Sequence, residues 1–411
     1  MILLDVSRLV SRLGLGPLTG IDRVERAWLE HLQGSDHGLT ARVARRQLLL
    51  GPQAGAALLG WLDDPASVPR PGGMVAALRR PVQPRARAEE ALARGALAVG
   101  LPGAVGLGRR LRALGEGNAW LSLGHANLAP GPWRALGGIA RVVMIHDTIP
   151  LDFPEYTRAG QDAAFRRRLS VALTHADLIL TVSGATRADV IRWRDRLGLP
   201  RRAAVVAAPI GTTLAEARPA EIPADLPRDR PYFVALGTIE PRKNHAVLLD
   251  AWARLAERTP PAALPRLLIL GRRGWENDAV FRRLDALSPG GAVVERAGLT
   301  DGAVAALLEG ARALLMPSRA EGFGMPLAEA AGRGLPVLAA PLPAAREVLG
   351  EAGTWLDPDD PGAWADAAAA LAAAPPQRNR VAMRPWSAHF SQVTALLRDY
   401  LKESDRPCPD G

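Results

Sequence analysis

The chain has 411 residues, of which 48% are hydrophobic and 23% are charged, as in globular proteins. This length exceeds one ordinary hydrophobic core, so we expect two domains. The single cysteine, Cys408, excludes an intrachain disulfide framework. No apolar run reaches the roughly 18 residues of a membrane span, and Asp5 interrupts the apolar start MILLDVSRLV. We therefore expect a cytoplasmic protein without a signal peptide.

The net charge of +9 is unevenly distributed along the chain. Residues 1–206 carry 28 arginines against 17 acidic residues, whereas residues 207–411 carry 23 basic against 25 acidic residues. The first half is therefore expected to face an anionic partner, unless it is simply a solvated surface rich in arginine. Without zinc-ligand spacing, heptads or many Tyr and Phe residues, we expect no nucleic-acid partner. An anionic membrane surface or a lipid-phosphate acceptor fits at least as well.

The first half alternates short apolar runs with longer amphipathic stretches, which predicts a parallel sheet covered by helices. Ser183 is expected to cap a helix over 184–197. Residues 51–118 are rich in Gly, Pro, Ala and Arg and show no pattern that we can assign. The other predicted elements are strands at 2–6, 119–123, 141–145, 177–182 and 203–208 and a helix near 21–33.

The second half repeats this alternation more clearly. We expect two doubly wound α/β domains, residues 1–210 and 211–385, with a proline-rich linker at 215–231 and a cleft between the carboxyl ends of their strands. A last helix over 386–402 and a tail complete the segment 386–411. The predicted strands are 232–236, 266–270, 292–297, 313–317, 336–340 and 354–356, and the predicted helices lie near 244–258, 276–287, 301–311, 326–333, 343–349 and 361–373.

The segment GTIEPRKNH, residues 237–245, holds one of only two lysines in the chain. It follows a predicted strand and precedes a predicted helix. A helix N-terminus favours an anion through its free N–H groups and its dipole. Arg242 and Lys243 at this place suit a diphosphate, and the alternative is a solvated basic turn.

The segment SRAEGFGMPLAEAAGRG, residues 318–334, follows another predicted strand. Pro326 suits the first turn of a helix, which places Glu329 in that helix and Glu321 in the loop before it. Gly322 and Gly324 let the backbone come close to a ligand. Two acids around a glycine loop can accept hydrogen bonds from sugar hydroxyls, although their spacing does not establish a glycosidase pair. The alternative is a surface loop and a capped helix.

Two stretches of the first half are weaker candidates. His146 and Asp147 end the strand 141–145, and a histidine there can donate or accept near neutral pH, although a purely structural histidine is more common. LGLGPLTGIDRVE, residues 13–25, resembles a phosphate-binding glycine loop but lacks GxGxxG and a P-loop lysine. Arg23, at the head of the next helix, could face the cleft.

Taken together, these stretches resemble family 4 of the retaining GT-B glycosyltransferases, nucleotide-sugar enzymes that build bacterial polysaccharides. The EGFGMPLAE segment is the most specific, and residues 34–118 match nothing that we can name. The resemblance implies two Rossmann-like domains facing a central cleft, with the last helix packing back on the N-terminal domain. The matching segments, which cover nearly the whole chain in the expected order, are GTIEPRKNH, PSRAEGFGMPLAEAAGRGLPVLA, REVLGEAGTWLDP, TVSGATRADV, IHDTIP and the terminal helix opened by Trp386.

The resemblance implies catalytic roles for four residues. Lys243 and Arg242 would bind the donor diphosphate, Glu321 would face the hydroxyls of the transferred sugar, and His146 would contact that sugar near the reacting carbon. Many relatives have arginine directly after the first glycine of GTIEPRKNH, where this chain has Thr238. The phosphate clamp is therefore expected to depend more on Arg242 and Lys243.

The resemblance also implies a donor-binding set. Gly20 would lie by the phosphates, Glu329 would hold the ribose, and Leu299 and Thr300 would lie near the base. The remaining members of the set are Arg23, Asp147, Thr238, Gly322 and the backbone N–H groups of Phe323, Gly324 and Met325.

From these residues we expect a retaining, metal-independent transfer of a hexose from a nucleotide-diphosphate sugar, with no cofactor. Fixed cations would stabilise the leaving diphosphate. Relatives with the TIEPRKN form of the motif favour GDP-mannose as donor. The acceptor is expected to be a saccharide or a lipid-linked saccharide at the inner membrane face. The alternatives are another GT-B activity, such as a sugar-nucleotide epimerase or a phosphorylase, and a non-catalytic nucleotide- or nucleic-acid-binding protein.

Overall fold

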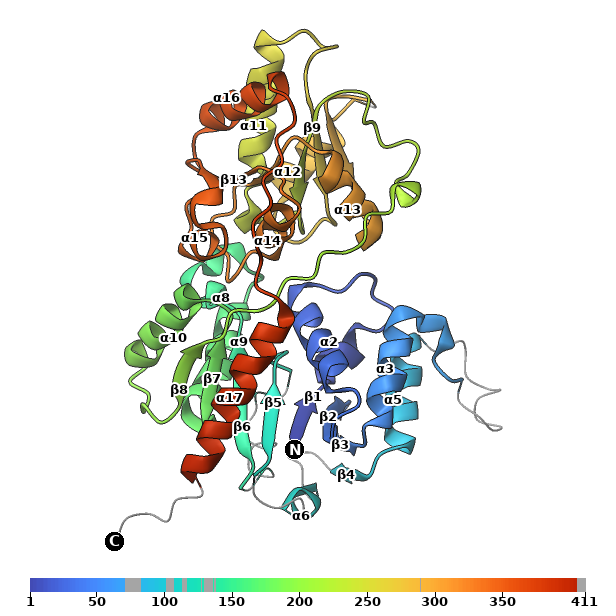
Figure 1. The fold of residues 1–411 in the computed structure, drawn as a ribbon, viewed down its shortest axis with the longest axis vertical. Helices are drawn as coiled ribbons and strands as arrows, with labels where there is room; N and C mark the ends of the chain where they lie inside the picture. Colours follow the sequence, from blue (N-terminus) through green and yellow to red (C-terminus); the bar gives the residue numbers. More distant parts are fainter. Residues whose placement is uncertain are drawn as a thin grey trace.

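The computed structural model describes residues 1–70, 83–100, 107–112, 117–126, 128, 136, 138–288 and 290–404. These residues form two α/β domains, with the N-terminal domain below the C-terminal domain in Figure 1. The predicted Cys408 tail lies outside the described residues. No helix in the described part of the chain is both long enough and apolar enough to cross a membrane.

The N-terminal domain is built on a sheet with the strand order β4-β3-β2-β1-β5-β6-β7-β8. The pairs from β2 through β1 to β8 are parallel, whereas β3 pairs antiparallel with both β2 and β4. The parallel pattern predicted for this half is thus wrong at one edge: residues 37–50, for which no strand was predicted, form the β2–β3 hairpin, and β4 pairs antiparallel with β3. The strands are β1 (Ile2–Asp5), β2 (His37–Val43), β3 (Arg46–Leu50), β4 (Ala98–Gly100), β5 (Ala119–Ser122), β6 (Ala140–Ile145), β7 (Leu178–Thr181) and β8 (Ala204–Ala207).

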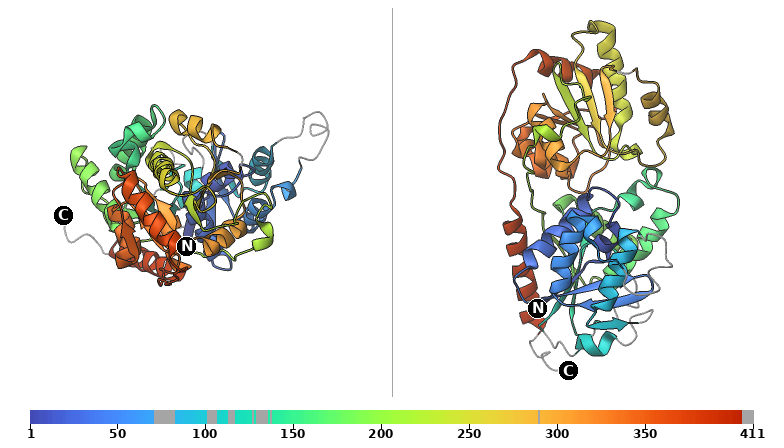
Figure 2. Two further views of the ribbon diagram at one scale, coloured as in Figure 1. Left: turned by 90° about the horizontal axis from the view of Figure 1, so that it is seen from above. Right: turned by 90° about the vertical axis from the view of Figure 1, so that its right-hand side faces the viewer.

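Helices cover both faces of this sheet (Figure 2). The predicted cap Ser183 is confirmed, because its Oγ accepts a hydrogen bond from the N–H of Thr186 at 3.0 Å. Thr19 and Asp22 form a capping box at the start of α2, which the sequence did not predict. The helices are α1 (Ser7–Arg12), α2 (Gly20–Leu32), α3 (Gln53–Asp63), α5 (Pro84–Arg94), α6 (Leu107–Arg112), α8 (Ile149–Asp152), α9 (Gln161–His175) and α10 (Gly184–Arg196).

The C-terminal domain is a wholly parallel sheet with the order β11-β10-β9-β12-β13-β14. Each predicted strand and helix of this half is present, with ends shifted by no more than two residues. The elements are β9 (Tyr232–Leu236), α11 (His245–Arg258), β10 (Arg266–Leu270), α12 (Asp278–Asp285), β11 (Val293–Arg296), α13 (Asp301–Gly310), β12 (Leu314–Met316), α14 (Met325–Gly332), β13 (Val337–Ala339), α15 (Pro343–Leu349), β14 (Gly353–Trp355) and α16 (Pro361–Ala373).

The last helix, α17 (Trp386–Ser404), returns to the N-terminal domain, as the red helix in Figures 1 and 2 shows. The core on one face of the N-terminal sheet includes Phe390, Val393 and Leu397 of this helix. The indole N–H of Trp28 donates to Nε2 of His389 at 3.1 Å, so α17 and α2 share one buried polar contact. The chain therefore crosses between the domains twice, which ties both sides of the cleft together.

Candidate active site

The GTIEPRKNH segment leaves β9, passes through a short 3-10 turn and enters α11. Asn244, at the start of α11, has a φ of 54°, and its side-chain amide donates to the carbonyls of Pro317 and Pro358 at 3.3 and 2.7 Å. These bonds fix the turn against the loop after β12. Lys243 is thereby directed back to the end of β9, where a Cβ on Gly237 would lie 3.4 Å from its Cε.

Lys243 and Arg242 meet Glu321 in one buried ion-pair network. Nζ of Lys243 donates to Oε1 of Glu321 at 2.5 Å, and Nη1 of Arg242 lies 3.0 Å from Oε2 of the same carboxylate. Nε of Arg242 lies 2.6 Å from Glu240, whose exposed fraction is 2%. The structure thus brings the three predicted residues together and pairs the two cations with Glu321. Glu240 was missed, although it stands inside the same motif.

The charges of this network fix the protonation state of Glu321. Burial alone would raise its pKa, but the charges of Lys243 and Arg242 outweigh burial and lower the pKa to about 2. Burial lowers the pKa of Lys243 and raises that of Glu240. At neutral pH, Glu321 is therefore a carboxylate that accepts hydrogen bonds and has no proton to give.

The glycine loop before α14 touches the N-terminal domain. A Cβ on Gly322 would lie 2.0 Å from the carbonyl oxygen of His146, so only glycine permits this approach. The carbonyl of Gly322 accepts hydrogen bonds from the hydroxyls of Ser183 and Thr186 at 2.7 and 3.2 Å. The start of α10 therefore binds the glycine loop of the opposite domain. From the sequence, Ser183 was predicted only to cap α10.

His146 and Asp147 end β6 at this junction. Nε2–H of His146 donates to the carbonyl of Leu123 at 2.7 Å, which leaves Nδ1 as the acceptor of a neutral ring. Burial lowers the pKa of His146 to about 4. Oδ1 of Asp147 accepts the N–H of Ile149 at 3.1 Å, and burial raises its pKa against the opposing charge of Arg242. His146 can thus contact a ligand as a neutral ring.

A second contact between the domains lies at α2 and α14. Nη1 of Arg23 lies 2.6 Å from Oε1 of Glu329, and Nη2 lies 3.5 Å from Asp301. Burial raises the pKa of Glu329, and the charge of Arg23 opposes that rise. A Cβ on Gly20 would lie 3.4 Å from Sδ of Met325, so the glycine loop of α2 faces the start of α14. Glu329, the residue expected to hold the ribose, is thus already paired with Arg23 of the N-terminal domain.

A cavity of about 750 Å³ opens beside this contact. Its lining includes four of the predicted donor-binding residues, Arg23, Thr300, Met325 and Glu329, but neither His146 nor the ion-pair network. Its size is in the range of small-molecule sites. Other lining residues come from the end of α1, the glycine loop, α2, the segment after β8 and the start of α17, namely Arg12, Pro17, Arg26, Gly211, Thr212 and Trp386.

The remaining predicted residues lie around these two clusters. The hydroxyl of Thr300 caps α13 by accepting the N–H of Ala303 at 3.1 Å, and it also donates to Glu221. Leu299 packs on the C-terminal core, whereas Phe323 packs with Met325 against the N-terminal core. A Cβ on Gly274 would lie 2.9 Å from Cγ2 of Thr238, so Thr238 faces the segment after β10. Gly324 starts α14 with a φ of 92°.

Among the residues that the structure describes, no group of three or more His, Cys, Asp or Glu side chains is placed to hold a metal ion. The expected metal independence concerns the reaction and stays a prediction.

The two facing Rossmann-like domains have the GT-B fold, and residues 230–374 match the family described as glycosyl transferases group 1. Over these residues the chain is thus similar to a glycosyltransferase family, in line with the predicted fold and enzyme class, whereas retention and the assignment to family 4 stay predictions. Anabaena HepE, solved in complex with UDP-glucose, superposes with a TM-score of 0.56 at 15% identity over 98% of each chain, a likeness that shows the fold.

Two curated proteins from Escherichia coli are similar in sequence to part of this chain. The O-antigen chain mannosyltransferase B is 32% identical over 223 residues, which is 53% of this chain and 58% of the relative. The serotype-specific mannosyltransferase WbdA is 31% identical over 236 residues, also 53% of this chain but only 28% of the relative. The chain thus spans less than two thirds of either relative.

Proposed function

We propose that the protein is a retaining, metal-independent glycosyltransferase. It moves a hexose from a nucleotide-diphosphate sugar to a saccharide or lipid-linked acceptor in the synthesis of a surface polysaccharide. The buried network of Lys243, Arg242 and Glu321 is the observation that carries this proposal. It combines two cations for a diphosphate with a permanently ionised acceptor for sugar hydroxyls, at a glycine loop that faces the opposite domain.

In the proposed reaction, the bond between the anomeric carbon and the donor phosphate oxygen breaks. The acceptor hydroxyl oxygen forms the new bond on the same face, and its proton passes to the leaving phosphate. Lys243 and Arg242, which Glu321 now neutralises, take the diphosphate as a further partner and stabilise its growing charge without reorganisation. Glu321, with a pKa of about 2, holds hydroxyls rather than acting as an acid.

The remaining predicted residues orient the donor in this proposal. Neutral His146 offers Nδ1 to the transferred sugar, because its Nε2–H is engaged by Leu123. The nucleoside occupies the cavity of about 750 Å³, where Glu329 uses its second oxygen for the ribose and Thr300 lies near the base. No cofactor is needed for this arrangement.

The relatives support a hexose of the mannose type. Both curated relatives are named as mannosyltransferases, and one acts in O-antigen synthesis by name. HepE was solved with UDP-glucose, so the nucleotide in that complex is UDP and not the GDP expected for this chain. We propose GDP-mannose as the donor, and a cytoplasmic site of action with the basic N-terminal domain toward an anionic inner membrane face.

A two-stage assay tests this function. A thermal-shift screen with GDP-mannose, UDP-glucose and the free nucleotides identifies the donor, because a ligand that binds the native state raises stability with occupancy. Transfer to mannose-terminated oligosaccharides is then followed by mass spectrometry, and NMR of the product assigns the anomer. Binding of GDP-mannose with an α-linked product is expected. An inverted product would refute retention, and conversion of the donor without acceptor would indicate an epimerase.

A further inference from the structure

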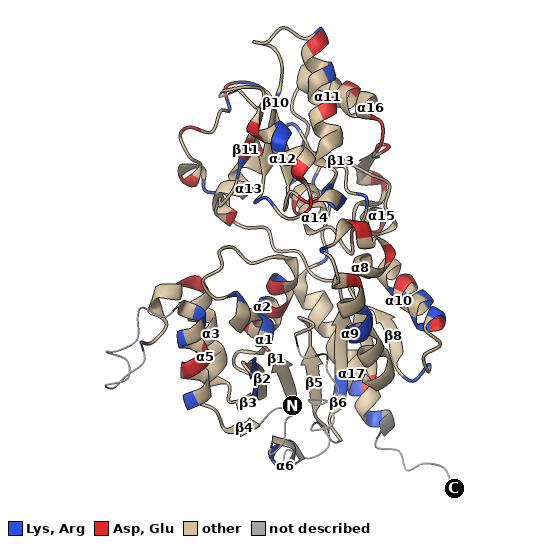
Figure 3. Ribbon diagram, turned by 180° about the vertical axis from the view of Figure 1, so that it is seen from behind, with Lys and Arg blue, Asp and Glu red and all other residues tan. Residues whose placement is uncertain are grey.

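The start of α10 is capped by a side chain of the other domain. Glu347 lies on α15, which packs on α10 where the two domains meet (Figure 3). Its Oε2 accepts the N–H of Gly184 at 2.7 Å, and its Oε1 accepts the N–H of Ala185 at 2.6 Å. The first N–H groups of a helix have no partner within the helix, and the helix dipole favours a negative charge beside them. One carboxylate of the C-terminal domain thus satisfies two of these groups in the N-terminal domain.

The residues at the start of α10 leave room for Glu347. Oγ of Ser183 accepts the N–H of Thr186 at 3.0 Å, so the N–H groups of Gly184 and Ala185 are left for another acceptor. A Cβ on Gly184 would lie 3.2 Å from Oε1 of Glu347, so glycine at this position lets the carboxylate come close. Glu347 itself is exposed. Because water can replace such a hydrogen bond at low cost, this contact between the domains can open and close.

The same end of α10 holds the loop that carries Glu321. The hydroxyl of Ser183 donates to the carbonyl of Gly322, the residue after Glu321, at 2.7 Å. The hydroxyl of Thr186 lies 3.2 Å from that carbonyl oxygen and 3.3 Å from the carbonyl oxygen of His146. The first turn of α10 thus touches one segment from each domain, and the proposed reaction needs these two segments side by side.

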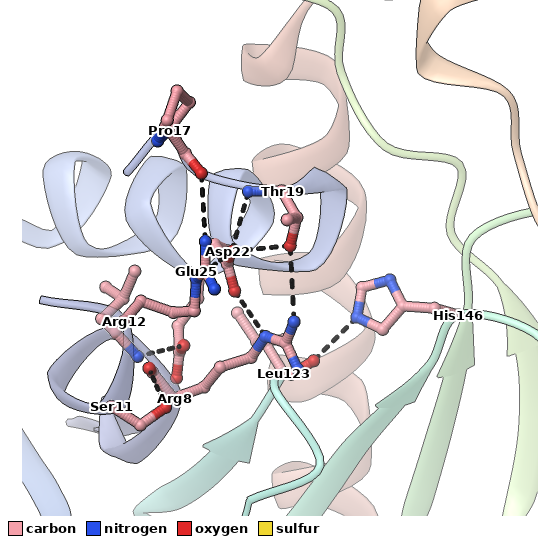
Figure 4. Close-up of polar contacts among 10 residues, drawn as sticks. Arg8, Ser11, Arg12, Pro17, Thr19, Asp22, Glu25, Leu123 and His146 are labelled. Carbon is pink, nitrogen blue, oxygen red and sulfur yellow. Dashed lines mark hydrogen bonds and ion pairs between the residues drawn. The ribbon is translucent and has the colours of Figure 1, made fainter. Parts of the chain in front are cut away.

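His146 and Glu321 are each fixed within their own domain. Nε2–H of His146 donates to the carbonyl of Leu123 at 2.7 Å, which holds the ring in the N-terminal domain (Figure 4). Glu321 is held in the C-terminal domain by Lys243 at 2.5 Å and Arg242 at 3.0 Å. Neither side chain can follow the other if the domains separate. The distance between them is therefore set by the way in which the two domains are joined.

Other contacts also join the domains, but they are less suited to a separate test. Arg23 lies 2.6 Å from Glu329, which the proposed function assigns to the ribose, so a change there would also alter donor binding. The indole N–H of Trp275 donates to the carbonyl of Tyr156 at 3.1 Å, away from the first turn of α10. Glu347 lies beside the loop of Glu321 through α10 and has no part in the proposed donor binding.

We propose that Glu347 is a positioning residue that latches α15 to the start of α10 and thereby holds the loop of Glu321 against the strand end of His146. The consequence for sugar transfer rests on the proposed function, whereas the latch itself concerns only the joining of the two domains. The proposed cations for the donor diphosphate, Lys243 and Arg242, belong to the C-terminal domain. Loss of the latch therefore lowers the kcat of transfer more than the affinity for the donor.

One variant on each side of the contact tests the latch. Glu347→Gln keeps the shape of the side chain, but its amide has no charge and one acceptor atom for the two N–H groups. Gly184→Pro removes one of the two donors, and proline suits the first position of a helix. We expect each variant to lower kcat by about 10-fold, as for the loss of a charged hydrogen bond, with nearly unchanged donor affinity by calorimetry. Glu351→Gln, which changes an exposed acid just after α15, is the matched control and should transfer as the wild type does.

The double variant shows whether Glu347 and Gly184 act through one contact. If they do, the kcat of Glu347→Gln combined with Gly184→Pro should be close to that of either single variant. Effects that multiply would overturn the latch, and so would wild-type kcat in Glu347→Gln or an equal loss in Glu351→Gln. A fall in donor affinity as large as the fall in kcat would place Glu347 in donor binding instead. If Gly184→Pro does not fold, Gly184→Ala replaces it, because its Cβ would lie 3.2 Å from Oε1 of Glu347.

A distance measurement tests the latch without any sugar transfer. In a Cys408→Ser background, nitroxide labels on Arg166→Cys of α9 and Ala253→Cys of α11, both exposed positions, report the separation of the domains by pulsed electron spin resonance. Glu347→Gln should extend the distribution to larger distances, whereas Glu351→Gln should leave it unchanged. An unchanged distribution in Glu347→Gln would refute the latch.

The two measurements keep the latch separate from the proposed reaction. A wild type that transfers no sugar, together with a distance distribution that depends on Glu347, would refute the glycosyltransferase and leave the latch standing. Sugar transfer by the wild type, together with a distribution and a kcat that do not depend on Glu347, would refute the latch and leave the proposed function standing.

Discussion

Replacing Lys243 by methionine separates its electrostatic role from its volume. The side chain lies in a buried network, and Nζ is 2.5 Å from Oε1 of Glu321. Methionine keeps most of the stem but removes the charge. Glu321 is then left with Arg242 at 3.0 Å, and we expect the fold to persist with lower stability. We expect sugar transfer to fall by roughly 100-fold or more, because a fixed charge on the leaving diphosphate is lost.

The magnitude of the stability change follows from the ionisation of Glu321. Its pKa is about 2 against an ordinary value of 4.5, a difference that corresponds to about 3 kcal/mol. Lys243 shares this stabilisation with Arg242, and its own charge is opposed by burial. We therefore expect Lys243→Met to lower the free energy of unfolding by about 2 kcal/mol at neutral pH.

The pH dependence of this loss has a definite sign. A carboxyl with a lowered pKa in the folded state contributes its full stability above pH 4.5, and that contribution is lost as the pH falls toward 2. Urea unfolding of the wild type and Lys243→Met over this range should show a difference that shrinks with acidification. Lys402→Met, the exposed lysine of α17, is the control. A stability loss that is independent of pH, or full transfer activity in Lys243→Met, would refute the reasoning.

Three further predictions concern the contact between the domains, the histidine and the metal. In Gly322→Ala the added Cβ would lie 2.0 Å from the carbonyl oxygen of His146. Sugar transfer should therefore be lost while the circular dichroism spectrum stays native. The control Gly60→Ala, which has open space around its Cβ, should stay active. Because the pKa of His146 is lowered from 6.5 to about 4, the wild type should lose stability relative to His146→Gln as the pH falls between these values, measured by urea unfolding; a constant difference would contradict a neutral buried ring. Excess EDTA should leave the transfer rate unchanged, and restoration of a lost rate by Mg²⁺ or Mn²⁺ would disprove metal independence.

The elements of the C-terminal domain could be predicted from the sequence because local signals agree there. Apolar runs such as YFVAL match β9 residue for residue, and Pro326 and Gly324 mark the start of α14. In the N-terminal domain, residues 51–118 could not be assigned, and no strand was predicted for residues 37–50. β2 and β3 form a tight antiparallel hairpin there, and β4 pairs antiparallel with β3 across about 50 positions; such a distant pairing is set by the neighbouring strand rather than by the residues themselves.

For the candidate active site, too, the sequence predicted one part and only the tertiary structure revealed the other. The sequence by itself determined the types of residue and their places after strands or in the helix that follows, and from these it proposed Lys243, Arg242, Glu321, His146 and Glu329 as candidate site residues. Only the tertiary structure decided their partners. It closed the ion pair between Lys243 and Glu321 across 78 positions of sequence and the bridge between Arg23 and Glu329 across 306. Side chains so far apart in the chain meet only through the packing of whole sheets and domains, and their protonation states follow from the burial and neighbouring charges that this packing creates.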